Sequence, residues 1–316
     1  MKIRLLISML LTFTVAAATS AQSSESAPAL AAAGGEKTLY AEGVMLLEQK
    51  DYASAAAKFS SAIAEQPAAE SYFLRGRAYH EQGMLAEAEA DYAQALTLDP
   101  DMAKAYYYRG AAEYLSESYH AAIEAYTQCI AIDSTYSYAY NDRGSANRRL
   151  ERYEEALADY TAAIAIDSTL DFLYSNRGAV YRLMKKYDEA IRDYDKAIQL
   201  SSQSAMIYNN RGLAKFGKED YKGALADFLA AKKYNPSYFH AFNNAGNAYY
   251  KQKKYAEALA EYDKAIKING SFGQAYLNRG IAKEMMRDDA GACADWQKAA
   301  DLNVPSAKNY VSAQCR

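Results

Sequence analysis

The sequence predicts an all-α protein built as a solenoid of helical hairpins, and three periodic features carry this prediction. A glycine recurs first after 33 residues and then after 34 residues six times. Twelve residues after each glycine stands an alanine, and four residues further on an aromatic ring. Steps of three and four residues place side chains on one helix face, so eight copies of a two-helix unit are predicted. The glycines are Gly43, Gly76, Gly110, Gly144, Gly178, Gly212, Gly246 and Gly280.

Each copy is numbered here from position 1 to 34, with its glycine at position 8. We expect helix A at positions 1–14 and helix B at positions 15–28. Small residues at positions 8, 20 and 27 let the two helices cross closely, and rings at positions 4, 17 and 24 fill the remaining space. A single hairpin cannot bury such a face, so neighbouring copies must stack. The 30 tyrosines are therefore interpreted mainly as packing residues.

This pattern of small and aromatic residues resembles the tetratricopeptide repeat. The resemblance covers residues 36–306 and implies a right-handed superhelical solenoid of helix-turn-helix repeats, with no linker between them. Tyr310 falls at position 4 of a ninth copy that has no helix B, so residues 307–316 are expected to form a C-terminal capping helix. The repeats are predicted at 36–68, 69–102, 103–136, 137–170, 171–204, 205–238, 239–272 and 273–306.

The first 21 residues resemble a secretory signal peptide, with Lys2 and Arg4 before an apolar run and small residues after it. Cleavage is expected after Ala21, and the protein is expected to be exported, either periplasmic or secreted. An uncleaved anchor is the alternative. The apolar run is too short for a comfortable membrane span, so no stable membrane insertion is expected after cleavage. Residues 22–35, rich in Ser, Ala and Gly, are expected to form a flexible leader.

Composition argues against several classes of function. The formal net charge of −3 becomes more negative without the signal segment, and no concentrated basic face is evident, so nucleic acid is not an expected partner. The three histidines, His80, His120 and His240, occupy unrelated repeat positions. No HExxH, CxxC, GxSxG or EF-hand spacing occurs. We therefore expect no catalytic residue, metal or cofactor, and a protein that is not an enzyme.

Function is expected on the concave groove lined by helix A. In tetratricopeptide arrays, positions 2, 5, 6, 9, 12 and 13 face that groove. Position 6 carries asparagine in the last four repeats, which resembles the ladder of O-linked N-acetylglucosamine transferase that holds a peptide backbone. A carboxamide offers both a donor and an acceptor to an extended chain. The alternative is that these amides bind only water or local backbone. The ladder is Asn176, Asn210, Asn244 and Asn278, and Asn209 and Asn243 at position 5 are expected to widen it.

Toward the N-terminus, aromatic residues occupy positions expected to face the groove. They indicate apolar anchors for a ligand, or else packing between repeats. The expected function is a non-enzymatic scaffold that binds an extended peptide or a partner protein in the groove. Self-association into a homo-oligomer of the cell envelope, and glycan binding through the groove aromatics, are the alternatives. The candidate aromatic residues are Phe73, Tyr107, Tyr108, Tyr114, Tyr138 and Phe172.

Position 7 carries arginine in six repeats, and position 23, sixteen residues later, carries aspartate in five of them. We expect ion pairs between helices A and B, with solvated charge as the alternative. Glu42 and Lys58 reverse the charges in the first repeat. Arg109 instead faces Ala125, with Glu124 adjacent. The predicted pairs are Arg75 with Asp91, Arg143 with Asp159, Arg177 with Asp193, Arg211 with Asp227, and Arg279 with Asp295.

Three cysteines cannot all pair within one chain. Cys129 takes the alanine position 27 and is expected to be a buried free thiol. Cys293 lies in the last helix B and Cys315 in the capping helix, and these two helices must pack together. Because export favours oxidation, we predict a disulfide between Cys293 and Cys315.

Overall fold

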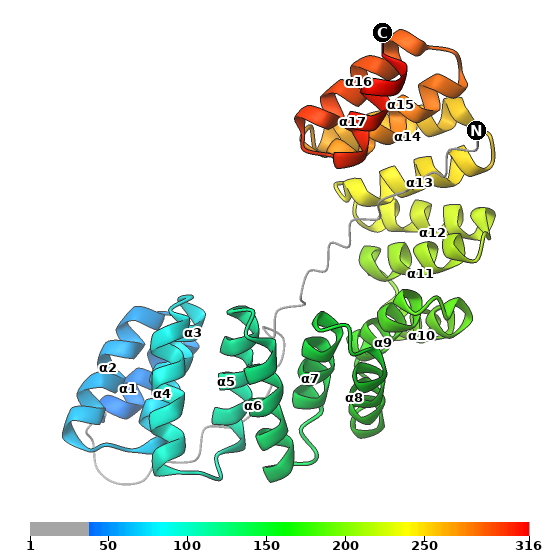
Figure 1. The fold of residues 1–316 in the computed structure, drawn as a ribbon. Coiled ribbons are helices and arrows are strands. Elements are labelled where there is room, and N and C mark those ends of the chain that lie inside the picture. Colours follow the sequence, from blue (N-terminus) through cyan, green and yellow to red (C-terminus); the bar gives the residue numbers. More distant parts are fainter. Residues whose placement is uncertain (1–37, 316) are drawn as a thin grey trace. The chain divides into compact units, whose positions relative to one another are not determined.

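A computed structural model describes residues 38–315 of the chain, and its regular structure is entirely α-helical in that range (Figure 1). The predicted signal peptide and leader lie outside the described residues. The helices are α1 Leu39–Glu48, α2 Tyr52–Glu65, α3 Ala69–Glu81, α4 Leu85–Leu98, α5 Ala103–Leu115, α6 Tyr119–Ile132, α7 Ser137–Arg149, α8 Tyr153–Ile166, α9 Asp171–Leu183, α10 Tyr187–Leu200, α11 Ala205–Gly217, α12 Tyr221–Tyr234, α13 Phe239–Lys251, α14 Tyr255–Ile268, α15 Gly273–Met285, α16 Asp289–Asp301 and α17 Pro305–Gln314.

Odd-numbered helices up to α15 are helix A of successive repeats, and even-numbered helices are helix B. Helix A ends at position 13 and helix B begins at position 17, so the predicted boundaries at 14 and 15 were wrong. The reason is the residue at position 15, which has a positive φ in every repeat. In the third repeat, Ser118 N–H donates to the carbonyl of Glu113 and Glu117 N–H donates to that of Tyr114. This is a Schellman turn, which ends helix A.

The predicted close crossing of helices A and B is present in each hairpin for which the contact is described. A Cβ atom on Gly212 would lie 2.6 Å from the Phe228 ring, and one on Gly246 would lie 2.5 Å from the Tyr262 ring. These rings at position 24 are buried. Real Cβ atoms do not approach carbon this closely, so position 8 must be glycine for the ring to pack against the backbone of helix A.

The described chain forms two compact units, and the boundary between them falls inside α9 after Val180. The N-terminal unit, residues 38–180, has a core of alanines and rings from helices A and B that includes Phe59, Tyr92 and Tyr126. The C-terminal unit, residues 181–315, buries Phe228 and Trp296 in the same way. Among residues 38–315, no helix has both the length and the apolar character needed to cross a membrane.

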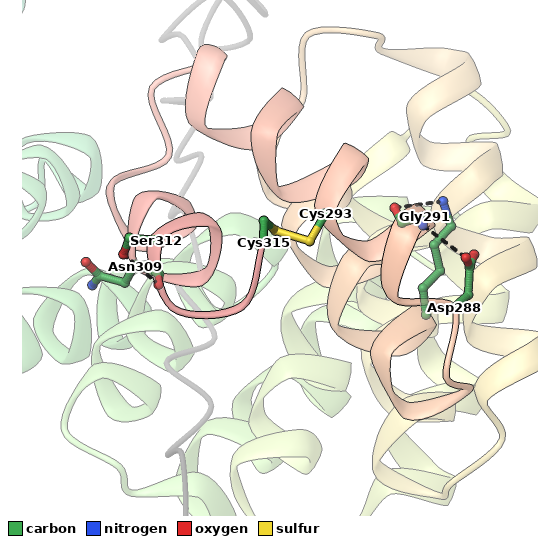
Figure 2. The surroundings of a disulfide bond; sticks show 7 residues. Asp288, Gly291, Cys293, Asn309, Ser312 and Cys315 are labelled. Atoms are coloured by element: carbon green, nitrogen blue, oxygen red, sulfur yellow. Dashed lines mark hydrogen bonds between the residues drawn. A yellow bond between two sulfur atoms is a disulfide. The ribbon is translucent and has the colours of Figure 1, made fainter.

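The capping helix α17 begins at Pro305, two residues earlier than predicted, and packs against α16. The Tyr310 ring lies 4.9 Å from the Trp296 ring, centroid to centroid. The predicted disulfide between Cys293 and Cys315 is present and ties the end of α17 to α16 (Figure 2). Its Cα atoms are 5.5 Å apart, inside the range that a disulfide requires. Cys129 is a buried free thiol, as predicted, and burial raises its pKa to about 12.

Candidate functional site

In the C-terminal unit, the asparagines of helices A form hydrogen bonds between neighbouring repeats. Asn244 Nδ2 donates to Asn209 Oδ1 at 2.9 Å, and Asn278 Nδ2 donates to Asn243 Oδ1 at 3.0 Å. In both cases position 6 of one repeat binds position 5 of the repeat before it. The ladder amides are therefore held by the amides predicted to lie beside them.

Asn278 belongs to the interior of this unit. It is 4% exposed, and its Nδ2 also donates to Asn247 Oδ1 at 3.1 Å while its Oδ1 accepts from Gln274 Nε2 at 3.0 Å. Both amide protons are therefore used within the fold. Asn209 and Asn243 are equally buried, so the expectation that they widen an exposed amide surface was wrong. The side-chain Oδ1 atoms of Asn209 and Asn243 face the next repeat, where they accept from the position 6 amides and orient them.

Two ladder residues of the C-terminal unit remain partly exposed. Asn210 makes no side-chain hydrogen bond within the described residues, and Asn244 donates one of its two amide protons to Asn209. Asn244 Oδ1 accepts only a long bond of 3.5 Å from Asn243 Nδ2. Both side chains therefore keep donor and acceptor capacity for a ligand.

The N-terminal unit carries a continuous polar chain across α5, α7 and α9. Asn176 Nδ2 donates to Asn141 Oδ1 at 2.9 Å, and Asn141 Nδ2 donates to Asp142 Oδ1 at 2.8 Å. Tyr107 Oη donates to Asp142 Oδ2 at 2.8 Å. Asp142 occupies position 6, where the next repeat has Asn176. The ladder position is thus an acid in one repeat and an amide in the next.

Asp142 differs from the other inward-facing aspartates because it has no ion pair within the described residues. Its partners are the neutral donors of Tyr107 and Asn141. Burial raises the pKa of Asp142 to about 6, and its two hydrogen bonds offset only part of that effect. Burial and the charge of Asp142 in turn raise the pKa of Tyr107 well above its ordinary value.

The predicted aromatic anchors divide into packing residues and surface residues. Phe73 and Tyr107 are buried, so for them the packing interpretation holds. Tyr108 is partly buried and packs edge-on against both rings, at centroid distances of 5.5 and 5.3 Å. Tyr138 and Phe172 are partly exposed and stack with their centroids 5.8 Å apart. This stacked pair is therefore within reach of a ligand.

The predicted ion pairs between helices A and B are present for four of the five arginine and aspartate pairs, and also for Lys58 with Glu42 at 2.6 Å. Arg177 and Asp193 belong to different units, and their pairing stays a prediction. Arg109 pairs with Glu113 on its own helix at 3.0 Å, since position 23 offers it only alanine. The four confirmed arginine pairs are Arg75 with Asp91 and Arg143 with Asp159, both at 2.7 Å, Arg211 with Asp227 at 2.6 Å, and Arg279 with Asp295 at 2.5 Å.

Sequence reasoning missed a second contact of these arginines. Each one also donates to a side chain at position 25 of the preceding helix B, so the guanidinium of each of the four confirmed pairs joins three helices. Position 25 offers a hydroxyl or a carboxylate in each of these repeats, which is the signal that could have revealed the contact. The acceptors are Ser60, Thr127, Thr161, Asp195 and Asp263, reached by Arg75, Arg143, Arg177, Arg211 and Arg279 respectively.

Comparison with known proteins places the chain in a family. Models described as tetratricopeptide repeat match residues 40–103, 85–137, 137–170 and 172–204, and one described as TPR repeat matches residues 246–286. The chain is a tetratricopeptide repeat protein. No curated protein matches its sequence.

Solved structures show the same tetratricopeptide fold at low sequence identity. A tetratricopeptide repeat protein from Parabacteroides merdae is 18% identical, with a TM-score of 0.64, over 78% of this chain and 99% of that one. The Cut9–Hcn1 hetero-tetramer of APC/C is 15% identical, with a TM-score of 0.62, over 88% of this chain and 55% of that one. Yeast Tom70 is 17% identical, with a TM-score of 0.56, over 87% and 63%. The chain therefore spans less than two thirds of the last two.

Tetratricopeptide repeats stack into solenoids whose extended faces bind other proteins, so this chain has the fold of a protein-interaction scaffold. Within residues 38–315, no group of three or more His, Cys, Asp or Glu side chains is arranged to hold a metal ion.

Proposed function

We propose that this protein is a non-enzymatic scaffold whose helix-A faces bind extended polypeptide, through the amide of Asn176 in the N-terminal unit and the amides of Asn210 and Asn244 in the C-terminal unit. One observation carries the proposal. The amide of Asn244 is fixed by Asn209 at 2.9 Å and yet stays partly exposed, and Asn176 is fixed by Asn141 in the same way. An amide held by its own scaffold loses little conformational entropy when it binds a ligand.

An extended main chain suits these amides because it presents N–H and C=O groups in alternation. Asn176 Oδ1 has no hydrogen-bond partner within the described residues, and Asn210 uses neither end of its amide there. Each can therefore accept from a peptide N–H or donate to a peptide C=O. Such contacts recognise the backbone of the peptide. Selectivity for particular peptide side chains must come from other groups on the helix-A face.

The two alternative functions have less support. Glycan binding needs exposed rings, and two of the candidate rings, Phe73 and Tyr107, are buried. Self-association has no observation of its own, although the hetero-tetramer of the structurally similar Cut9–Hcn1 supports protein partners in general. We further propose that the protein is exported. The signal-like residues 1–21 and the disulfide, which an oxidising compartment favours, support that location.

The test is a selection of peptides from a displayed random dodecapeptide library on the chain from Gln22 to Arg316, followed by fluorescence anisotropy of the selected peptides. Replacing Asn210 with alanine should weaken binding about five-fold, because the hydrogen bonds that one amide side chain makes to the peptide are lost. The matched control is Asn309→Ala, an exposed asparagine on α17. If no peptide is enriched above background, or if Asn210→Ala binds as tightly as the control, backbone recognition by the ladder is wrong.

A further inference from the structure

We propose that Asp142, together with the stacked rings of Tyr138 and Phe172, forms a subsite for a basic side chain, Lys or Arg, of the bound segment. The proposal rests on the proposed function and adds to it the chemical class of residue that the N-terminal unit selects. All residues of the subsite lie within that unit.

The subsite has a simple layout on two neighbouring helices. Tyr138 and Asp142 are four residues apart on α7, and Phe172 and Asn176 are four residues apart on α9, so each pair shares one helix face. The two rings stack at 5.8 Å, and Asp142 is joined to Asn176 through the amide of Asn141. One row of the patch is therefore aromatic, and the other consists of a carboxylate and a ladder amide.

The carboxylate of Asp142 lacks a counter-charge that comparable aspartates possess. Asp91 and Asp159, which are buried between helices, each accept from an arginine at 2.7 Å, whereas Asp142 is partly buried. Asp142 accepts only from Tyr107 and Asn141, and each of its oxygens keeps a free lone pair. A carboxylate that is partly shielded from water and has no cation beside it destabilises the fold, and a cation supplied by a ligand would offset that cost.

The surroundings favour a long basic side chain over other ligand groups. The aliphatic stem of Lys or Arg can lie along the Tyr138 and Phe172 rings, whose faces also attract the charge. Asp167 adds a second negative field near Tyr138. An acidic side chain would be repelled by both carboxylates, and a neutral one would gain no charge-assisted hydrogen bond.

The groups that face Asp142 allow a pH test. Tyr107 and Tyr114 face it from α5, Tyr126 from α6, Tyr138 from its own helix and Tyr160 from α8. Burial raises the pKa of every one of these tyrosines, so they stay neutral near pH 7. Arg148 adds a positive field that reaches Tyr114 and Tyr160. Asp142, with its pKa near 6, is therefore the member of this set that changes charge between pH 5 and 7.5.

The experiment compares peptides selected from the random dodecapeptide library by the wild type, by Asp142→Asn and by Glu154→Gln. Glu154 is an exposed acid on α8, so its replacement matches the change in net charge. The selected peptides are then resynthesised with Gln or Glu in place of the shared basic residue, and their affinities are measured at pH 7.5 and pH 5.

The expected result is a shared Lys or Arg among peptides selected by the wild type and by Glu154→Gln. Its replacement by Gln should weaken binding to both proteins about ten-fold at pH 7.5, and less at pH 5. Asp142→Asn should bind the Lys and Gln peptides within about two-fold of each other, still above background. Enrichment without a basic residue, or a preference that survives in Asp142→Asn, overturns the subsite and leaves backbone binding intact. No enrichment by any protein overturns both.

Discussion

At the scale of one residue, Asp142 shows how a side chain of the proposed subsite can lower the stability of the fold. Burial raises its pKa from the ordinary 3.8 to about 6, so the folded state holds the proton more tightly than the unfolded chain does. The contribution of this group to stability is therefore complete below pH 4 and is lost as the pH rises through 6. At pH 7 the ionised carboxylate destabilises the fold.

Replacing Asp142 with asparagine should therefore raise the free energy of unfolding at pH 7 by about 1–2 kcal/mol, after allowance for the screening of a partly exposed group. The gain should vanish at pH 4, where wild-type Asp142 is already neutral. Urea unfolding at both pH values measures this difference. A variant that is less stable than the wild type at pH 7 would show that the charge of Asp142 is compensated within the fold.

The ion pairs at positions 7 and 23 predict a contrast between two equivalent arginines. Asp91 is 4% exposed and its ion pair is with Arg75, whereas Asp295 receives both Arg279 and, at 2.8 Å, Lys283. Arg75→Leu strands a buried carboxylate and should cost roughly 3 kcal/mol or more. Arg279→Leu leaves the lysine in place and should cost less.

Chemical denaturation of both single variants measures this contrast. The double variant with leucine at both 75 and 91 completes the cycle, and it should be more stable than Arg75→Leu alone because no charge is left stranded. Equal losses for Arg75→Leu and Arg279→Leu would mean that the second cation contributes nothing.

At the scale of the element, the turn between helices A and B depends on one left-handed residue. Position 15 has a φ between 59° and 75° in all eight repeats, yet only the second repeat uses glycine there, at Gly83. The other seven are exposed charged residues such as Glu151. A residue with a Cβ atom is strained in this conformation, so the protein carries a small cost in seven turns.

Glu151→Gly should therefore stabilise the protein by about 0.5–1 kcal/mol, since relief of the left-handed strain exceeds the added freedom of the unfolded chain. Gly83→Ala is the converse change. No atom lies within 4 Å of the added Cβ, so its expected loss of about 1 kcal/mol comes from backbone conformation alone. Thermal unfolding of both variants tests the pair, and a shift of the same sign in both would contradict it.

The repeat pattern predicted the helical hairpins because small residues and rings alternate with the period of the helix. It missed the helix boundaries, because charged residues such as Lys253 and Arg287 give no sign that they adopt a left-handed conformation. It also missed a contact within the turn after helix B, where the side chain at position 31 accepts from the backbone two residues later, as Asp133 does from Thr135 N–H at 2.9 Å.

At the scale of the whole molecule, the repeat numbering predicted which positions form the candidate site. It did not predict the contacts that these residues make. Repeat numbering located the ladder, but Asn209 and Asn210 are adjacent asparagines, and nothing in the sequence distinguishes the buried one from the partly exposed one. One is buried and the other partly exposed, because position 5 faces the next repeat and position 6 lies one helical step away. The hydrogen bond of Asn244 to Asn209 spans 35 residues, so no local pattern reveals it.

The capping helix α17 closes the C-terminal unit, and its attachment depends on packing and on one covalent bond. It covers Trp296, which is 1% exposed and lies under Tyr310. The disulfide from Cys293 to Cys315 spans 22 residues of sequence. In the chain-entropy model, a loop of that size stabilises the fold by roughly 3 kcal/mol. Because a solenoid end has a neighbour on one side only, this bond should limit fraying of the cap.

Cys315→Ser should therefore loosen α17 while the preceding repeats stay folded. Trp296 is the single tryptophan of the chain, so its fluorescence reports the cap alone. We expect a red-shifted emission and stronger quenching by acrylamide, with the far-ultraviolet circular dichroism reduced by no more than the ten residues of α17 contribute. Reduction of the wild type should give the same change, whereas Cys129→Ser, at a buried free thiol remote in sequence, should leave the emission unaltered. An unchanged emission in Cys315→Ser would show that packing of Tyr310 and Val311 against Trp296 holds the cap without the disulfide.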